Sequence, residues 1–168
     1  MTHGEVILLR LLVPRDYYAY ELNRIIDENS MRRWADIGFS SIYHLLNKME
    51  AKELVDSRLQ KHPGAPERKV YSITEKGKEE LHGEVKRMIS APRPVHDDVT
   101  VALVVSDILS DGEKKEALAS YNLKLHEQLR VIEEDMPEPV QQKAWVMQAF
   151  DRVKQVTEAE IRWIKTLE

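Results

Sequence analysis

Hydrophobic residues recur at helical spacing in three short segments of the first fifty residues. An apolar stretch over residues 5–13 predicts a helix that Pro14 stops. In residues 18–29, and again in residues 42–49, apolar side chains fall about three and four positions apart, which marks one buried helix face in each segment. The pattern therefore predicts three core helices. Ser40 precedes the third and can cap its amino terminus.

A change to strand-forming sequence follows the third helix. Residues 55–59 alternate between apolar and polar side chains, and residues 69–73 are again rich in strand-forming types. The segment between them, residues 61–67, contains two prolines and a glycine, which is typical of a turn. These runs predict a β-hairpin. Thr74 is a candidate cap for a fourth helix, whose apolar positions are Leu81, Val85 and Met88.

The tetrapeptide APRP at residues 91–94 marks a boundary, because its two prolines cannot continue a helix. Beyond it, residues 98–109 are almost continuously apolar. A strand is the alternative for such a run, but its length and the acidic Asp97 and Asp98 at its start favour a buried helix. Residues 110–113 fit the S-x-x-E capping box and predict a new helix start.

Two long helices are predicted in the rest of the second half. The first carries a coiled-coil-like seam of apolar residues three and four positions apart. Residues 136–139 end it, and the last helix, residues 140–167, is apolar on two sides. Because one chain offers no evident cover for these surfaces, we expect a homodimer. The residues assigned to dimerisation are Leu118, Tyr121, Leu125, Leu129, Ile132, Val146, Val153, Ile161 and Ile164.

The element order predicts a mainly α-helical fold with a small β-hairpin. Three helices followed by a hairpin is the plan of a winged helix-turn-helix domain, whose third helix enters the major groove of DNA. We therefore assign residues 1–90 to a winged helix-turn-helix DNA-binding domain and residues 91–94 to a linker. Residues 95–168 are assigned to a helical domain for dimerisation and effector binding.

The composition narrows the class of protein. A length of 168 residues suffices for one or two domains with a real core. The chain has no cysteine, which excludes disulfides, thiolate metal sites and cysteine nucleophiles. The apolar run of residues 6–13 is too short to span a membrane, contains Arg10 and lacks a signal-peptide pattern. We expect a cytoplasmic protein without a membrane partner.

The formal net charge of -4 taken alone argues against nucleic-acid binding. The charge is distributed unevenly, however. Residues 1–77 carry 12 Lys and Arg against 11 Asp and Glu, whereas residues 78–168 carry 13 against 18. This asymmetry allows a DNA-binding face on the first half, although ordinary solvated surfaces show similar variation.

Three segments give the first half a more specific interpretation. They read YYAYEL at residues 17–22, SSIYHLLNKME at residues 40–50 and RKVYSITEKG at residues 68–77. Together they resemble the PadR family of bacterial regulators, over about half of the chain. The resemblance implies a winged helix that binds double-stranded DNA. In the second half, DDVTVALVVSDILS and RWIKTLE are similar to the helical dimerisation region of that family.

Two positions depart from the family pattern. The family usually has glycine where this chain has Ala19 and Glu53. Ala19 adds only a methyl group inside a helix. At Glu53, glycine would suit a left-handed helix terminus, so we expect a differently shaped turn there.

The outer face of the third helix carries hydroxyl, imidazole, amide and ammonium groups, which suit phosphates and base edges. A solvated helix face is the alternative for this pattern, and the resemblance favours DNA contact. The hairpin adds basic side chains around its PGAPE tip, which could follow a phosphate strand or a minor groove. The DNA-binding candidates are Ser40, Ser41, Tyr43, His44, Asn47 and Lys48 on the helix, and Arg58, Lys61, His62, Arg68 and Lys69 on the hairpin.

Catalytic and metal-binding motifs are weak by comparison. Glu79 with His82, and the run His96-Asp97-Asp98, have ligand types at short spacing, but most such groupings bind no metal. The sequence contains no HExxH, P-loop, GxSxG or dinucleotide motif. We therefore expect no metal, no cofactor and no enzymatic activity.

Three aromatic residues in the last predicted helix are candidates for an effector pocket, since aromatic ligands favour aromatic walls. They are Trp145, Phe150 and Trp163. Core or interface packing is the commoner role for such side chains. Trp34, in the loop before the third helix, has no assignment from the sequence.

The sequence thus predicts a ligand-responsive transcriptional regulator that binds an inverted-repeat operator as a homodimer. Within the family, the resemblance implies repression more often than activation. The alternative is a winged-helix module that docks another protein through the same helix face. Salt dependence distinguishes the two, because DNA binding releases counterions from phosphates and weakens steeply as salt rises.

Overall fold

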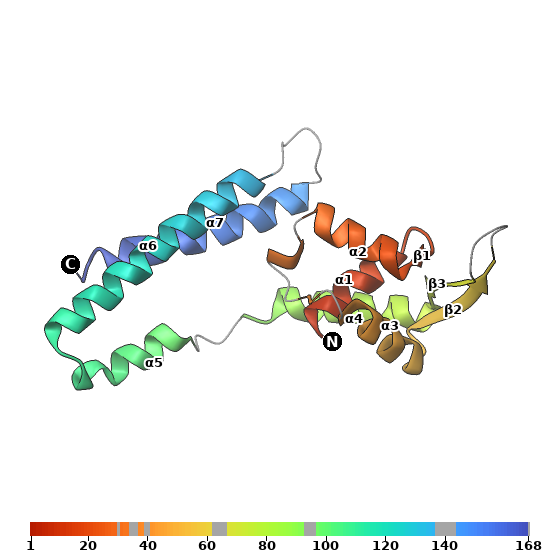
Figure 1. Cartoon of the computed structure of the whole chain (residues 1–168), viewed down its shortest axis with the longest axis horizontal. Helices are drawn as coiled ribbons and strands as arrows, with labels where there is room; N and C mark the ends of the chain where they lie inside the picture. The colour runs from red at the N-terminus through yellow and green to blue at the C-terminus, as the bar shows by residue number, and fades with distance from the viewer. Residues whose placement is uncertain are drawn as a thin grey trace. The chain divides into compact units, whose positions relative to one another are not determined.

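The computed structural model describes residues 1–29, 31–33, 37–38, 41–61, 67–92, 97–136 and 144–167. The chain divides into two compact units, Met1–Pro94 and Val95–Glu168. Figure 1 shows helices and a small sheet in the first unit, and helices in the described part of the second. No helix among the described residues is both long and apolar enough to cross a bilayer.

The first unit is built on three helices that share one core. They are α1 (His3–Leu12), α2 (Ala19–Glu28) and α3 (Ser41–Ala51). The three core helices predicted from the apolar spacing are therefore confirmed. A fourth helix, α4 (Glu75–Ser90), adds Leu81 to the same cluster. The fully buried side chains of the core include Leu8, Leu9, Leu12, Leu22, Ile26, Ile42, Leu46, Met49 and Val55.

Local hydrogen bonds set the helix ends. Thr2 and Glu5 form a capping box at the start of α1, in which each backbone N–H donates to the other residue's side chain. Thr74 caps α4 as predicted, since its hydroxyl accepts from the Gly77 N–H at 2.9 Å. The predicted cap Ser40 lies outside the described residues.

Three antiparallel strands form the sheet, in the order β1-β3-β2. The predicted hairpin is present as β2 (Val55–Gln60) and β3 (Arg68–Ile73), and its tip lies outside the described residues. The edge strand β1 (Tyr17–Tyr18) was not predicted. Two residues are too few to show an alternating pattern, so only the pairing of Tyr17 with Tyr71 and Tyr18 with Val70 reveals it.

The turn between α3 and β2 keeps the left-handed backbone that glycine favours. Glu53 has φ 60°, so the expectation of a differently shaped turn is wrong. Leu54 directly after it is held by the Thr74 N–H, which donates to the Leu54 carbonyl at 3.1 Å. This hydrogen bond ties the end of α3 to the start of α4. The conformation therefore survives the loss of glycine, at a cost of roughly 1–2 kcal/mol.

The second unit contains α5 (Asp98–Val104), α6 (Asp111–Asp135) and α7 (Ala144–Ile164). The predicted capping box at Ser110 is present at the start of α6. Helices α6 and α7 pack together with opposite chain directions. The Tyr121 hydroxyl donates to Glu160 at 3.0 Å, and Lys154 pairs with Glu133 at 2.7 Å. Burial and the Glu160 carboxylate raise the pKa of Tyr121 to about 12.

This pairing corrects one premise of the sequence analysis. The seam of α6 does not need a second chain to cover it, because α7 covers it. Leu125 is buried and the other seam residues, Leu118, Tyr121, Leu129 and Ile132, are half-buried. On α7, Ile161 and Ile164 are buried and Val146 is half-buried, while Val153 is exposed. Periodicity identified these apolar faces but could not say which face meets which.

The run of residues 98–109 was expected to be one buried helix, and this prediction is wrong. Helix α5 ends at Val104, and a 3-10 turn, η2 (Ser106–Ile108), follows it. Val104 is 80% exposed and Ile108 is 82% exposed. The predicted inward positions Val85 and Met88 of α4 are exposed as well. Apolar side chains favour burial, but in one chain the described residues do not bury these positions.

Gly77 and Gly83 of α4 give a matched pair of tests of the fold. A Cβ at Gly77 would lie 2.1 Å from the Leu54 carbonyl oxygen, whereas a Cβ at Gly83 would meet nothing within 4 Å. We expect Gly77→Ala to lower the free energy of unfolding by about 1–3 kcal/mol or more through overpacking. Gly83→Ala should raise it by about 0.5–1 kcal/mol. Urea denaturation of both variants tests this, and equal effects would contradict the close approach of α4 to Leu54.

Candidate nucleic-acid interface

Helix α3 has one buried and one exposed face. Ile42, Leu46 and Met49 are fully buried against the core. On the opposite side, the exposed residues are Tyr43, His44, Asn47 and Lys48. Tyr43 keeps 53% of its surface exposed, so its ring and hydroxyl are accessible to a partner. The structure thus brings four of the predicted helix residues onto one surface.

Ser41 begins α3 and is half-buried. Its hydroxyl donates to the Gly38 carbonyl, and its backbone N–H donates to the same oxygen at 3.1 Å. Two donors of the first helical residue are therefore already used within the protein. The hydroxyl oxygen retains acceptor capacity only, which does not suit a phosphate.

Lys48 and Lys52 of α3 share a buried carboxylate on α1. Glu5 is 1% exposed, and its Oε1 lies 3.1 Å from the Lys48 ammonium and 3.5 Å from that of Lys52. Burial opposes ionisation of Glu5. The hydrogen bonds from the Thr2 N–H and Lys48, and the charges of both lysines, outweigh it, so the pKa of Glu5 lies below its ordinary value.

Two of the predicted hairpin cations also have carboxylate partners. Arg58 of β2 pairs with Asp16 at 2.8 Å, and Lys69 of β3 pairs with Glu50 at 3.1 Å. The Ser57 hydroxyl donates to the same Glu50 carboxylate. That hydrogen bond and the Lys69 ammonium hold the pKa of Glu50 below its ordinary value. Because Glu50 belongs to α3, it joins this helix to both strands of the hairpin.

Arg68 and Lys61 lie at the two hairpin ends nearest the tip, and both are exposed. The Arg68 guanidinium lies 5.4 Å from the centre of the Tyr20 ring, within the range of a cation–π contact. Tyr20 in turn stacks on Tyr18 with ring centres 5.5 Å apart. Tyr20 was not predicted from the sequence, since no spacing pattern connects it with Arg68. The remaining hairpin candidate, His62, lies outside the described residues.

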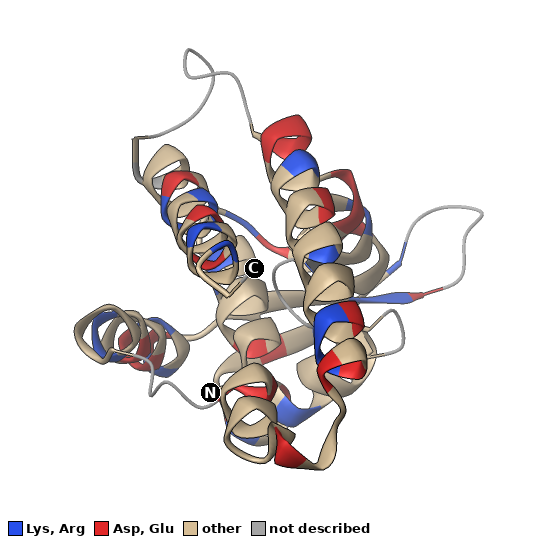
Figure 2. Ribbon diagram, turned by 90° about the vertical axis from the view of Figure 1, so that its left-hand side faces the viewer, with Lys and Arg blue, Asp and Glu red and all other residues tan. Residues whose placement is uncertain are grey.

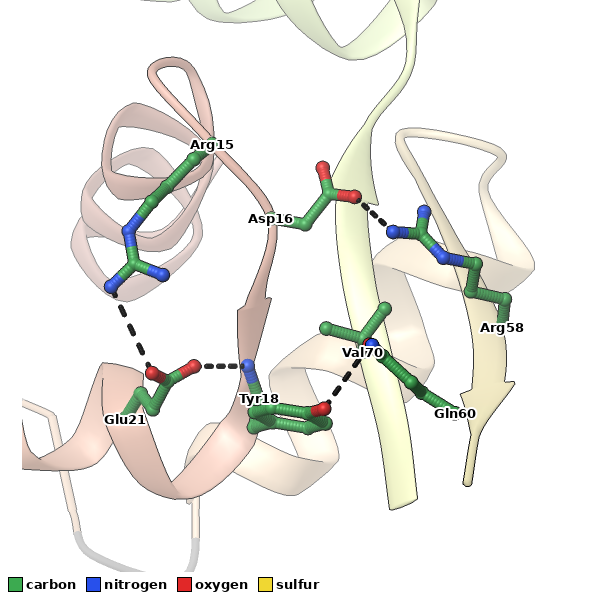
Figure 3. A pocket seen from close by; sticks show the side chains of 7 residues that line it. All are labelled: Arg15, Asp16, Tyr18, Glu21, Arg58, Gln60 and Val70. Atoms are coloured by element: carbon green, nitrogen blue, oxygen red, sulfur yellow. Dashed lines mark hydrogen bonds and ion pairs between the residues drawn. The ribbon is translucent and has the colours of Figure 1, made fainter. Parts of the chain in front are cut away.

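A hollow of about 560 Å³ lies where β1 and the start of α2 meet the wing (Figure 3). Two guanidinium groups and two carboxylates line it. Arg58 faces Asp16 on one side, and on the other Arg15 lies 3.8 Å from Glu21. The lining residues are Arg15, Asp16, Tyr18, Glu21, Arg58, Gln60 and Val70. Of these, only Arg58 was predicted from the sequence as a DNA-binding residue.

Opposite charges alternate along the helices in Figure 2, where Lys and Arg stand beside Asp and Glu. Many of these neighbours form ion pairs, such as Arg130 with Glu127 and Arg87 with Glu84 on single helices. On the described part of the chain, charged side chains therefore occur mostly as local pairs of opposite sign and do not form a single extended basic face.

The two effector candidates whose side chains the structure describes, Phe150 and Trp163, lie far apart on one helix. Phe150 is half-buried on α7, and Trp163 on the same helix is 37% exposed. They are thirteen positions apart on the helix, which corresponds to about 20 Å along the axis. The side chain of Trp145 and the whole of Trp34 lie outside the described residues.

The described residues contain no group of three or more His, Cys, Asp or Glu side chains that could hold a metal ion. Of the two groupings noted in the sequence, Glu79 and His82 are exposed on α4. The other includes His96, which the structure does not describe.

The chain matches a known protein family over its first unit. The model of the transcriptional regulator PadR-like family matches residues 8–83, which include α2, α3 and the wing. The chain belongs to the PadR-like family. A Lysinibacillus sphaericus relative, known as uncharacterized protein X, is 30% identical over 84 residues, which are 50% of this chain and 76% of that protein. The family is one of regulators and not a class of enzymes.

Solved structures share the fold over nearly the whole chain. Bacillus subtilis PadR in complex with operator DNA is 19% identical and has a TM-score of 0.73, covering 97% of this chain and 96% of that one. The complex of the same protein with p-coumaric acid is 19% identical, has a TM-score of 0.72 and covers 98% and 93%. The Vibrio cholerae virulence activator AphA is 22% identical, has a TM-score of 0.73 and covers 98% and 95%. These likenesses establish the winged-helix fold of this family member.

The Glu5 site predicts a pH-dependent stability. Glu5→Gln should lower the free energy of unfolding at neutral pH by about 1.5–3 kcal/mol, because charge-assisted hydrogen bonds at a buried carboxylate are lost. The pKa of Glu5 is lowered by folding, so its contribution is present above the unfolded value of about 4.3. It disappears as the pH falls through the lower folded value.

Urea denaturation at neutral pH and at a series of acidic pH values measures this difference. The control is Glu53→Gln, which removes an exposed carboxylate paired with Lys76 and should change stability little. A gap between wild type and Glu5→Gln that stays constant to the lowest pH would contradict an ionised, stabilising Glu5.

Proposed function

We propose that this protein is a DNA-binding transcriptional regulator that reads double-stranded DNA with α3. The observation that carries the proposal is the exposed polar face of α3, held over a fully buried apolar face and followed by a basic wing. A helix fixed in this way can enter a major groove without losing contact with its own core. Bacillus subtilis PadR, which shares the fold, has been solved with operator DNA.

Three side chains on this face supply the chemistry of base recognition. The Asn47 amide can donate and accept at once, as an adenine edge requires. His44 and Tyr43 add a ring nitrogen and a hydroxyl for base edges or phosphates. All three are exposed on α3, and none of them has a resolved carboxylate partner in the described part of the chain. They are the best candidates for sequence recognition.

Exposed cations supply the phosphate contacts. Arg68 and Lys61 flank the hairpin tip, where they can follow the DNA backbone. Ser40 and His62 remain candidates from the sequence alone. Lys48 stands apart, because its ammonium is shared with the buried Glu5. We assign Lys48 first to joining α3 with α1, and only second to DNA.

The protein acts as a homodimer in this proposal, and the second unit supplies the interface. The seam of α6 is covered by α7, so the interface is assigned to apolar side chains that stay exposed in one chain. They lie on α5 and η2 and on the outer side of α7: Val101, Val104, Val105, Ile108, Val153 and Val156. Exposed apolar clusters of this kind mark interaction surfaces. Two copies would present two reading helices to an inverted repeat.

We further propose that the regulator is a repressor whose DNA affinity a small molecule lowers. A bound dimer would occlude a promoter, and a ligand that prefers a DNA-incompetent arrangement would release it. The complex of Bacillus subtilis PadR with p-coumaric acid supports a ligand-responsive regulator. AphA, which shares the fold, is an activator, so reporter assays of the promoter decide the direction of regulation.

The reading helix can be tested with duplexes taken from the promoters of this gene and its neighbours. Wild type should prefer an inverted repeat with half-site centres roughly 10 bp apart. Asn47→Ala and Tyr43→Ala should each weaken specific binding by about 1–3 kcal/mol, or roughly 5- to 150-fold. Fluorescence anisotropy across a salt series measures both affinity and the salt slope.

His82→Ala is the matched control, since it removes an exposed polar side chain from α4 instead of α3. It should leave binding unchanged. If wild type bound none of the duplexes, or bound them with an affinity that did not depend on salt, the protein-docking alternative would be favoured instead.

The dimer surface gives a separate prediction. Val104→Glu combined with Ile108→Glu should shift the protein from dimer to monomer, because burying two unpaired carboxylates costs several kcal/mol. Gln128→Glu, at an exposed polar position of α6, should leave the dimer intact. Sedimentation velocity of both proteins measures the change. A dimer that survives the double substitution would exclude the α5 surface as the interface.

A further inference from the structure

The hollow in Figure 3 places two cations and two anions beside the proposed DNA-binding wing. Arg58 belongs to β2 and Arg15 to the segment before β1. Both side chains are more than half exposed, at 62% and 59%. Their guanidinium groups can be reached from solvent, and each can form two parallel hydrogen bonds to a phosphate.

A carboxylate already lies at each guanidinium. The Asp16 Oδ2 is 2.8 Å from Arg58, whereas the Glu21 Oε1 is 3.8 Å from Arg15. Glu21 has a second task, because its Oε2 accepts from the Tyr18 N–H at 2.9 Å at the start of α2. Asp16 has no such backbone partner among the interactions resolved in the described residues. Asp16 is therefore the more easily displaced of the two anions.

Two contacts other than the ion pairs hold the residues around the hollow. The Tyr18 hydroxyl donates to the Gln60 Oε1 at 3.1 Å, which ties β1 to β2 across the central strand β3. Arg15 also lies 3.8 Å from the centre of the Tyr17 ring. These contacts do not involve the Asp16 carboxylate, so they hold the backbone around both arginines whether or not Asp16 is paired with Arg58.

We propose that the hollow is a phosphate subsite, in which a DNA backbone phosphate replaces Asp16 as the partner of Arg58 and is also bound by Arg15. The proposal rests on the proposed DNA-binding function and adds a contact site and a role for Asp16. In the free protein Asp16 stands where a phosphate oxygen would lie. The displaced Asp16 carboxylate stays close to Arg58, so the pair offers no net positive charge to the phosphate and wild-type Arg58 adds little to the counterions that DNA releases.

Asp16 thereby limits the sequence-independent part of DNA affinity. The pair of Glu50 with Lys69 places a second carboxylate beside a wing cation, but Glu50 also accepts from Ser57 and holds α3 to the wing. Removing Glu50 would disturb the fold along with the charge. Asp16 is partly exposed and offers the cleaner test.

The experiment measures binding of a fluorescein-labelled duplex of arbitrary sequence by anisotropy over a series of sodium chloride concentrations. Asp16→Asn should steepen the log–log slope of affinity against salt by about 0.9, because Arg58 becomes free for one phosphate. Near 0.1 M salt this corresponds to about eightfold tighter binding. Arg15→Ala should weaken binding and flatten the slope by less than this, because Arg15 is itself paired with Glu21 in the free protein.

Matched controls lie on α2, away from the hollow. Arg24 and Glu28 form an exposed ion pair at 3.5 Å, so Glu28→Gln removes one negative charge and frees one arginine just as Asp16→Asn does. Arg24→Ala matches Arg15→Ala. If Asp16→Asn changes binding only as much as Glu28→Gln does, the effect is one of net charge and the subsite is excluded. Weaker binding by Asp16→Asn would mean that Asp16 positions Arg58 for DNA, which also overturns the proposal.

Two further outcomes separate the sources of failure. If the wild-type protein binds no duplex, the proposed function itself is excluded. If wild type binds but Asp16→Asn and Arg15→Ala have the same salt slope of affinity as wild type, only the subsite is excluded. Free phosphate is tested by replacing chloride with sodium phosphate at constant ionic strength and measuring the Tm. A larger phosphate-dependent rise of Tm for Asp16→Asn than for wild type, without any effect on DNA affinity, would assign the hollow to a small anion and overturn the DNA assignment.

Discussion

The burial of one face of α3 is the contact on which the rest of the interface depends. Ile42, Leu46 and Met49 are completely enclosed by side chains of α1, α2 and the start of the sheet. A helix held by three buried side chains within two turns cannot rotate without exposing apolar surface, at a cost of roughly 1.5–3 kcal/mol for each. The opposite face is therefore presented in one orientation, with Tyr43, His44 and Asn47 outward.

Charge pairing refines this arrangement. Three carboxylates on different elements hold three of the cations near the proposed DNA surface: Glu5 with Lys48, Asp16 with Arg58 and Glu50 with Lys69. The buried Glu5 joins α1 to α3, and Glu50 joins α3 to the wing. The same side chains thus stabilise the relative positions of these elements and reduce their net positive charge. In the proposed function, a chain of net charge -4 would make its phosphate contacts through local cations of this kind.

In the second unit, some apolar faces are buried within one chain and others stay exposed. Helices α6 and α7 satisfy each other along one face, with Leu125, Ile161 and Ile164 buried between them. The apolar residues of α5 and η2 remain exposed in one chain. Hydrophobic burial is not directional, so such residues specify that a cover is favourable and not which element provides it. In the proposed homodimer, the apolar surface that one chain leaves exposed would supply the interface.

The sequence by itself determined the local structure of this protein. Apolar spacing predicted α1, α2, α3 and the hairpin, and hydroxyl caps marked the starts of α4 and α6, because these signals act between residues close in the chain. The motifs around residues 17–22, 40–50 and 68–77 carried the family assignment, and the polar side of α3 carried most of the candidate site.

Only the tertiary structure decided which charges and faces meet. Glu5 and Lys48 are 43 positions apart, and Asp16 and Arg58 are 42 apart, so no periodic pattern links them. The two-residue strand β1, the hollow beside it and the partner of the α6 seam depend equally on contacts between distant segments. Hydrophobic and ionic preferences are properties of single residues, whereas their satisfaction depends on distances that exist only after the chain has folded.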